Sequence, residues 1–174
     1  MAHCSAQSTS VVIRLAGSSD AAAVAEIYRP VVESTHISFE LVAPDADEMR
    51  SRIEHISRSY PWLVATEGDA VLGYAYASRH RERAGYAPST DVSIYLRDAA
   101  RGRGIGTALY TALFELLAQR NDLHRAFAGV TLPNDASVAL HRKLGFAPVG
   151  VYHEAGTKFG RWFDVSWWER PIRA

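Results

Sequence analysis

The sequence predicts an α/β (α+β) domain, because segments with strand character alternate with segments of helical apolar spacing. Strand-like runs rich in Val, Ile and Tyr occur at 11–16, 62–67, 71–78, 89–96, 126–132, 149–154 and 162–169. Helical patterns occupy 20–34, 44–59, 104–119 and 134–146. The order of elements is therefore β-α-α-β-β-β-α-β-α-β-β. In such a layout a ligand is expected where a strand ends and the next helix starts.

The composition is that of a globular protein and excludes several functional classes. The 174 residues are enough for a substantial core, and 48% of them are hydrophobic. The formal net charge is zero, with 19 acidic and 19 basic residues, so general attraction to nucleic acid or to an anionic membrane is not expected. No apolar run approaches the roughly 20 residues of a membrane-spanning helix.

Residues 1–10 are predicted to form a flexible tail before a single domain that spans 11–174. The tail, MAHCSAQSTS, lacks the apolar centre of a secretory signal. It contains Cys4, the only cysteine of the sequence, so no intramolecular disulfide is expected and a catalytic thiol is not expected either. This use of cysteine favours a cytoplasmic location.

The N-terminal half places two helices between strands. The first helical segment, DAAAVAEIYRPVVES, begins near Asp20, and Pro30 within it is expected to kink or break the helix. In the second segment, PDADEMRSRIEHISRS, one face carries Met49, Ile53 and Ile56. The runs WLVATE and VLGYAYAS flank the turn GDA and predict a β-hairpin.

The C-terminal half is dominated by a long helix that follows a glycine-rich loop. From Ile105 onward the apolar residues of this helix return at the spacing of a buried face, at Ala108, Leu109, Ala112, Leu113, Leu116 and Leu117. A strand, AFAGVTL, and a short helix, NDASVALHRKLGF, come next. The strands VGVYHE and WFDVSWWE complete the predicted sheet.

The glycine-rich loop reads RGRGIG from Arg101 to Gly106. A helix start carries free N–H groups and partial positive charge, which bind anions such as phosphate, and Arg101 and Arg103 add full charges. A turn without a ligand is the alternative. Two known phosphate motifs do not fit, because the dinucleotide motif needs glycine where Thr107 stands and no Gly-Lys-Ser/Thr triplet of a P-loop follows.

With a strand before it and a helix after it, this R-x-x-G-x-G loop resembles the acetyl-CoA pyrophosphate loop of the GCN5-related N-acetyltransferase (GNAT) superfamily. The resemblance implies a GNAT fold, which is a mixed central β-sheet with helices on both faces. It also implies that the loop and the end of the preceding strand hold acetyl-CoA. The residues at these positions are Tyr95, Leu96, Arg101, Gly102, Arg103, Gly104, Ile105, Gly106 and Thr107.

A second segment, LPNDASVALHRKLGF, resembles the closing motif of the superfamily, N-x-x-A/S-x-x-L-Y/H-x-x-x-G-F. The resemblance implies that Asn134 contacts the pantetheine arm of acetyl-CoA and that Ser137 lies beside it, a role compatible with a plain N-cap. His141 stands where many relatives have the tyrosine that protonates the departing CoA thiolate. Without the motif, an isolated helical histidine is more often a surface or core residue.

Further segments narrow the resemblance to the phosphinothricin and methionine sulfoximine acetyltransferase branch. They are VSIYLRDAARGRGIGTALYTALFELL, EAGTKFGRWFDVSWWE and, in the N-terminal half, IYRPVVESTHISFE, so that 11–170 is covered. The resemblance implies transfer of the acetyl group of acetyl-CoA to the α-amine of phosphinothricin, methionine sulfoximine or methionine sulfone, by direct attack. Members are commonly homodimers, and Trp162, Trp167 and Trp168 are candidate interface aromatics.

The candidate base departs from the branch pattern T-V-E-x-S/T-V-Y-V. Counting back from Tyr95, Asp91 occupies the position of the glutamate. An α-amine with a pKa of about 8 is mostly protonated at neutral pH, so a carboxylate, or a water that it holds, has to remove a proton. Asp91 is the expected base, and a structural strand-edge aspartate is the alternative. The backbone N–H groups of Tyr95 and Leu96 are expected to bind the oxyanion.

The loop SRHRERAGYAP is the candidate reader of the substrate. In the family, basic residues and a tyrosine of this loop contact the acidic groups of the substrate, and Arg81, Arg83 and Tyr86 match them. Guanidinium groups suit carboxylate and phosphinate oxygens. Phe39 matches an aromatic residue near the substrate. The alternatives are a solvated charged loop and, for Phe39, a core position.

The seven histidines form no H-x₃-H pair and no cluster with cysteine, so no metal site is expected. Two other functions stay open. An N-terminal peptide acetyltransferase has the same fold and would contact the peptide backbone. A non-catalytic acyl-CoA-binding sensor would keep the glycine loop but could lose the base.

Overall fold

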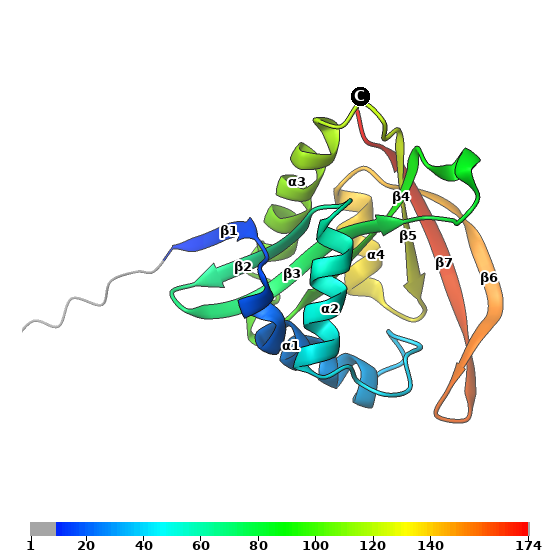
Figure 1. Cartoon of the computed structure of the whole chain (residues 1–174). Helices are drawn as coiled ribbons and strands as arrows, with labels where there is room; N and C mark the ends of the chain where they lie inside the picture. The colour runs from blue at the N-terminus through cyan, green and yellow to red at the C-terminus, as the bar shows by residue number, and fades with distance from the viewer. Residues whose placement is uncertain (1–9, 174) are drawn as a thin grey trace, which may run out of the picture.

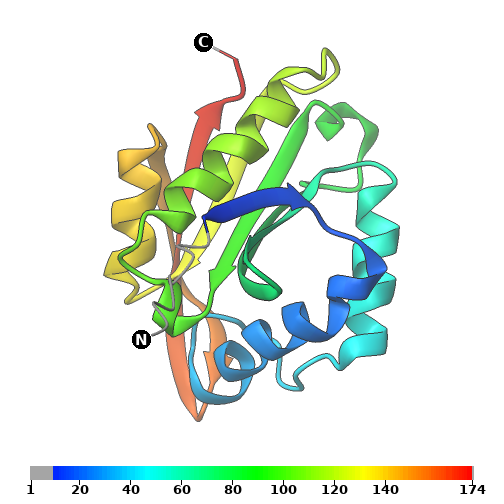
Figure 2. The same cartoon turned by 90° about the vertical axis from the view of Figure 1, so that its left-hand side faces the viewer.

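The computed structural model describes residues 10–173. Its seven-stranded sheet has the order β1-β2-β3-β4-β5-β7-β6, and helices cover both faces (Figures 1 and 2). Neighbouring strands are antiparallel except β4 and β5, which are parallel. The strands are β1 (Val11–Leu15), β2 (Trp62–Glu67), β3 (Ala70–Arg79), β4 (Ser89–Leu96), β5 (Arg125–Thr131), β6 (Ala147–Lys158) and β7 (Arg161–Pro171). The predicted mixed sheet and the order of elements are confirmed.

The predicted flexible tail lies outside the described residues, apart from Ser10, and so does Cys4. A single domain over 11–174 stays a prediction. Within residues 10–173, no helix combines the length and the apolar character needed to cross a membrane.

Two pairs of helices cover the two faces of the sheet (Figure 2). α1 (Ala21–Ser34) and α2 (Ala46–Ser57) pack over the face that buries Tyr74. α3 (Ile105–Ala118) and α4 (Asp135–Lys143) cover the opposite face. The predicted apolar stripe of α3 is indeed buried, since Leu109, Leu113 and Leu117 are fully enclosed. Each face of the sheet therefore has its own hydrophobic core.

Pro30 lies inside α1, and the helix continues past it to Ser34. A proline removes one backbone hydrogen bond and tends to end a helix. Here Ile27, before it, and Val31 and Val32, after it, are all buried in the same core. Tertiary packing holds both sides of the proline, so the expected break is absent.

β4 and β5 pair only where they begin. Their ladder joins Ser89–Asp91 to Arg125–Phe127, and the described residues contain no further pairing between the two strands. Both strands nevertheless continue, to Leu96 and to Thr131. They therefore diverge and leave a cleft within the sheet, and the glycine-rich loop that follows β4 lies along the same cleft.

β6 forms one edge of the sheet and is longer than predicted. Of the three tryptophans expected at an interface, Trp162 is 64% exposed, but Trp168 is 3% exposed and belongs to the core on the α3 face. Successive strand residues point to opposite faces, so Trp168 points inward while Trp167 lies on the other face. The prediction that Trp168 is an interface residue is therefore wrong, because its ring packs inside its own chain.

Candidate active site

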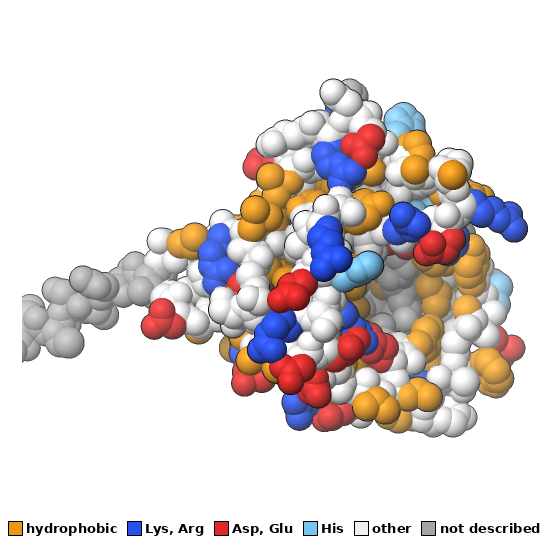
Figure 3. Space-filling view, in the orientation of Figure 1, with side chains coloured by type: hydrophobic (Ala, Val, Ile, Leu, Met, Phe, Trp, Pro, Cys, Tyr) orange, Lys and Arg blue, Asp and Glu red, His pale blue; other side chains and the backbone are white. Residues whose placement is uncertain are grey.

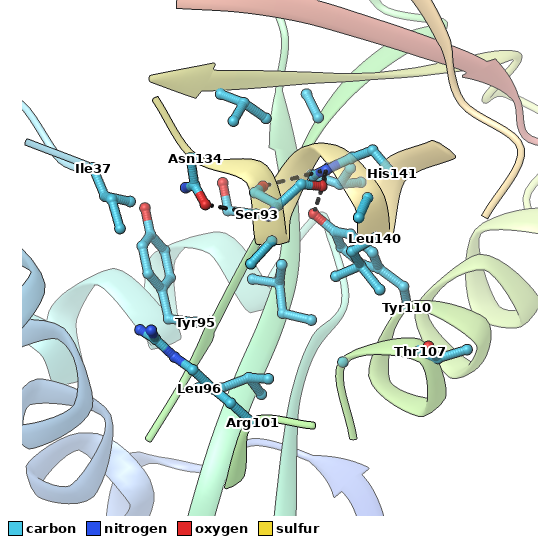
Figure 4. Close-up of a pocket in the computed structure, with 18 of the residues that line it drawn as sticks. Ile37, Ser93, Tyr95, Leu96, Arg101, Thr107, Tyr110, Asn134, Leu140 and His141 are labelled. Carbon is cyan, nitrogen blue, oxygen red and sulfur yellow. Dashed lines mark hydrogen bonds between the residues drawn. The ribbon is translucent and has the colours of Figure 1, made fainter. Parts of the chain in front are cut away.

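A cavity of about 460 Å³ opens where β4 and β5 diverge (Figure 4). Its walls are Val92–Leu96 of β4, Ala128–Thr131 of β5, the start of α3 and one face of α4. Figure 4 shows Tyr95 and Leu96, Thr107 and Tyr110, and Asn134 and His141 around this space. The cavity thus runs from the glycine-rich loop toward the point where the two strands meet.

Part of the cavity wall is unpaired backbone of β4. The N–H of Arg97 donates to the carbonyl of Leu72 in β3, at 2.9 Å. Backbone groups alternate in direction along an antiparallel ladder, so those of Ile94 and Leu96 point away from β3, toward β5. The Leu96 N–H can therefore bind an oxygen in the cavity. The same alternation directs the Tyr95 N–H into β3, so the prediction that this N–H binds the oxyanion is wrong.

The start of α3 is an open cradle of backbone groups. Gly104 caps the helix with φ 79°, and Gly102 has φ 73°, a region that side-chain-bearing residues rarely adopt. A Cβ placed on either glycine would meet no atom within 4 Å, so a side chain there would enter the space above the helix start. The first N–H groups of α3 have no intrahelical partner. This arrangement fits a diphosphate such as that of acetyl-CoA.

Most of the predicted cofactor residues line the cavity, and two do not. The lining includes Tyr95, Leu96, Arg101, Gly102, Gly104, Gly106, Thr107, Asn134 and Ser137. Arg103 instead pairs with Glu67 of β2, at 2.6 Å. Ile105 is 3% exposed and packs into the core under α3. Arg101 and the backbone are therefore better placed for a phosphate than the side chains of Arg103 and Ile105.

Asn134 is the N-cap of α4, and its Oδ1 accepts a hydrogen bond from the Ser137 N–H at 3.2 Å. The plain capping role considered for it is thus fulfilled. Because Oδ1 serves the cap, its amide nitrogen is left to donate toward the cavity, which Asn134 and Ser137 both line.

His141 is 2% exposed and lines the cavity from α4. Its Nδ1 lies 2.7 Å from the carbonyl of Ser137, which can only accept, so Nδ1 carries the proton. Burial lowers the pKa of His141 and favours the neutral ring. Its Nε2 is then an acceptor, 3.4 Å from the hydroxyl of Tyr110. In this state the ring has no Nε2 proton to give to a thiolate.

Asp91 is the last residue of β4 that pairs with β5, and its side chain is 27% exposed. Its Oδ1 is 2.6 Å from Nδ1 of His80, the residue that follows β3. Burial raises the pKa of Asp91, and contact with His80 and the charge of Arg81 oppose this rise. Asp91 does not line the cavity itself, but the next residue, Val92, does.

The loop between β3 and β4 brings two of its three predicted substrate residues to this end of the cleft. The Arg81 guanidinium lies over the ring of Trp167, 5.8 Å from its centre. The ring of Tyr86 is 6.0 Å from that of His80. Arg83 is exposed at the start of the short turn Ala84–Tyr86, apart from these contacts. None of the three lines the cavity.

Phe39 lies in the segment between α1 and α2 and packs against β6. A Cβ on Gly156 would come within 2.4 Å of its ring, so the two are in close contact. Lys158, 5% exposed, holds the same segment through a hydrogen bond to the carbonyl of Ser38, at 2.7 Å. Phe39 therefore helps to fix this segment beside the sheet and does not line the cavity.

Sequence reasoning missed His80, Tyr110 and Lys158. Tyr110 falls on the buried stripe of α3 and looks like a core residue. His80 gains its partner only through the register that sets Ser78 opposite Asp91, which no local pattern reveals. Among residues 10–173 there is no group of three or more His, Cys, Asp or Glu placed to hold a metal ion.

The family model described as "Acetyltransferase (GNAT) domain" matches residues 13–167. Phosphinothricin N-acetyltransferase of Streptomyces coelicolor is 40% identical over 93% of this chain and 96% of its own length. L-methionine sulfoximine/L-methionine sulfone acetyltransferase of Pseudomonas aeruginosa is 36% identical over 90% of this chain and 92% of its own.

A solved structure agrees with these sequence matches. The phosphinothricin acetyltransferase of Sinorhizobium meliloti, in complex with acetyl-CoA, has a TM-score of 0.89 and 37% identity over 94% of this chain and 89% of its own. The chain therefore belongs to the GNAT acetyltransferase family. It has the GNAT fold and is an N-acetyltransferase that uses acetyl-CoA.

Proposed function

We propose that the protein acetylates the α-amine of a small amino acid whose side chain ends in an acidic or tetrahedral group, such as phosphinothricin, methionine sulfoximine or methionine sulfone. The observation that carries this proposal is that the cleft between β4 and β5 has different chemical groups at its two ends. One end is an anion cradle at the start of α3, and the other holds a half-buried carboxylate, Asp91, next to a guanidinium. The names of the similar proteins from Streptomyces coelicolor and Pseudomonas aeruginosa support the substrate class.

At the cradle end, the backbone of Gly102–Gly106 and the Arg101 guanidinium bind the diphosphate of acetyl-CoA. The amide of Asn134 and the edge of β4 hold the pantetheine arm along the cavity. Bound in this way, acetyl-CoA supplies an activated acetyl thioester. The Leu96 N–H is the donor available to an oxygen that gains negative charge during the transfer.

At the opposite end, Asp91 supplies the negative charge of the proton-accepting site. The acceptor amine has to lose a proton to become a nucleophile, and its attack on the thioester needs no acyl-enzyme. Arg81 binds the acidic or tetrahedral group of the substrate, and Tyr86 lies beside it. Arg83 contributes less to binding than Arg81, because it is exposed away from Trp167 and His80.

His141 has a modest part in the departure of the thiolate. A thiolate is a stable leaving group, and the neutral ring has its proton on Nδ1. The hydroxyl of Tyr110, which points to Nε2 of His141, is the proton-bearing group next to it. Burial strongly raises the pKa of Tyr110, so this hydroxyl keeps its proton and can act as a hydrogen-bond donor.

The experiment that tests this function is a thiol-release assay with acetyl-CoA and a panel of acceptors. Phosphinothricin, methionine sulfoximine and methionine sulfone are expected to be the best acceptors, ahead of ordinary amino acids and of peptides with free N-termini. Preference for the peptides would favour a peptide acetyltransferase. Tight binding of acetyl-CoA without turnover of any acceptor would favour a sensor domain.

We also infer a homodimer that uses the edge of the sheet formed by β6 and β7. Hydrophobic side chains gather along this edge (Figure 3). The exposed ones are Val149, Val151, Tyr152, Phe159 and Trp162. Such an apolar, unpaired strand edge favours pairing with another chain. A cytoplasmic location stays a prediction from the use of cysteine.

A further inference from the structure

His80 and Asp91 form a close hydrogen-bonded pair. Nδ1 of His80 is 2.6 Å from Oδ1 of Asp91, and the two side chains are 10% and 27% exposed. The chain contains a second His–Asp contact, His153 with Asp164 at 3.0 Å, but there the histidine is 79% exposed. Of these two contacts, the first is by far the better sheltered from solvent.

The pair lies at the closed end of the cleft. Asp91 and Phe127 are the last residues at which β4 and β5 pair with each other, and the residues that follow each of them, Val92 and Ala128, already line the cavity. The His80 ring stacks on Phe127, with ring centres 4.4 Å apart and planes 16° apart. It lies at 80° to the ring of Trp167, with ring centres 6.3 Å apart. Three neighbours thus fix the orientation of the imidazole.

The hydrogen bond determines which nitrogen of His80 is basic. An ionised carboxylate only accepts hydrogen bonds, so Nδ1 of His80 carries the proton. In the neutral ring, the lone pair is then on Nε2, for which the described residues provide no hydrogen-bond partner. A buried aspartate that fixes the tautomer of a histidine and stabilises its protonated form is the arrangement of the general base in serine proteases.

We propose that Nε2 of His80 is the atom that accepts the proton of the substrate amine. In this proposal the Asp91 carboxylate orients the imidazole and stabilises its positive charge once it is protonated. This proposal rests on the proposed function. The ammonium form of the amine first loses one proton to Nε2, and the neutral nitrogen then forms a bond to the thioester carbonyl carbon and loses a second proton to solvent. The C–S bond then breaks, and the electron pair leaves with the CoA thiolate. The imidazolium returns its proton to that thiolate or to solvent.

Charged and titratable side chains approach His80 from each of the neighbouring segments. Asp91 faces it from β4, and Tyr86 approaches it from the turn before β4. Arg81 follows it in the chain and also acts on Asp91. Beyond Phe127, Arg125 of β5 is paired with Glu169 of β7 at 2.7 Å, so their charges largely cancel. Asp91 is therefore the carboxylate that directly stabilises a protonated His80.

His80→Asn is the informative variant. The asparagine amide can replace the Nδ1–H donor to Asp91, but it has no basic nitrogen. If His80 is the base, kcat/KM for the best acceptor is expected to fall at least about 100-fold, with the affinity for acetyl-CoA unchanged. The loss should shrink as pH rises, because more of the amine is already neutral. His153→Asn is the matched control and should keep wild-type kinetics.

A near-normal kcat/KM and pH profile for His80→Asn would overturn the proposal, because Asp91 or a water would then be the base. A separate readout does not need turnover. In ¹⁵N NMR spectra of the full chain, the neutral His80 ring should be the Nδ1–H tautomer, and Asp91→Asn should change the tautomer populations. An Nε2–H ring in the wild type would overturn the proposal. Absence of acetylation by the wild type would instead overturn the proposed function and leave the tautomer as the deciding result.

Discussion

The Asp91 carboxylate is buried enough for its pKa to be raised above the ordinary value. A carboxyl group with a raised folded-state pKa costs folding free energy while it is ionised, and this cost disappears as pH falls through that pKa. Asp91→Asn is therefore expected to keep or increase the Tm at neutral pH, while kcat/KM falls at least about 100-fold. Thermal unfolding and kinetics on the same sample check both parts. A lower Tm with unchanged kinetics would make Asp91 a structural residue.

Replacement of His141 is expected to cost less activity than replacement of Asp91. His141→Asn can keep the hydrogen bond to the carbonyl of Ser137 and removes the ring nitrogen that faces Tyr110. A thiolate needs little help to leave, so we expect kcat to fall by no more than about 10-fold. Steady-state kinetics at saturating acetyl-CoA measure this. If the loss exceeded that of Asp91→Asn, His141 would be the main proton-transfer group.

At the level of single residues, the motifs located the site but not the state of each side chain. The glycines and Asn134 could be predicted, because their spacing reflects what a backbone cradle and a helix cap require. The partners of Arg103 and His80 could not, since Glu67 and Asp91 reach them across strand pairings that are distant in sequence. The buried tautomer of His141 likewise depends on packing between α3 and α4.

The start of α3 allows a test of the cradle with a matched control. Gly104→Ala places a methyl group in the space above the helix start and also strains a backbone with φ 79°. Gly68→Ala, in the turn between β2 and β3, introduces comparable strain at φ 57°, with equally open space. We expect both to lower the Tm slightly. Only Gly104→Ala is expected to weaken acetyl-CoA binding, by 10-fold or more, and a 10-fold loss corresponds to about 1.4 kcal/mol of binding free energy.

Calorimetric titration with acetyl-CoA measures the two affinities. Equal affinities for the two glycine variants would mean that the loop is only a turn and that the diphosphate binds elsewhere.

At the level of elements, periodicity was sufficient for the helices and most of the strands. The apolar stripe of α3 and the alternating strand runs depend on local spacing, which the sequence displays directly. The divergence of β4 from β5 could not be predicted, because both strands have ordinary β-sequences and the cleft arises from the place where their pairing stops. The helix break expected at Pro30 was wrong for a related reason, since burial on both sides of the proline outweighs one lost hydrogen bond.

For the whole molecule, the two edges of the sheet give a test of the homodimer. Trp162, 64% exposed, lies on β7 beside the edge strand β6, whereas Val12, 52% exposed, lies on the opposite edge strand, β1. Trp162→Ser is expected to shift the protein toward monomer, and Val12→Ser is expected not to. Sedimentation velocity over a range of protein concentrations measures the shift. A wild-type monomer at all concentrations, or a shift only with Val12→Ser, would contradict this interface.

The most direct test of direct transfer to an α-amine follows the acetyl carbon itself. With ¹³C-acetyl-CoA and phosphinothricin or methionine sulfoximine, NMR should show the label appear as an amide on the α-nitrogen of the acceptor, at the same rate as free thiol is released. Thiol release with the label recovered as free acetate, or bound to the protein, would contradict direct transfer to the amine.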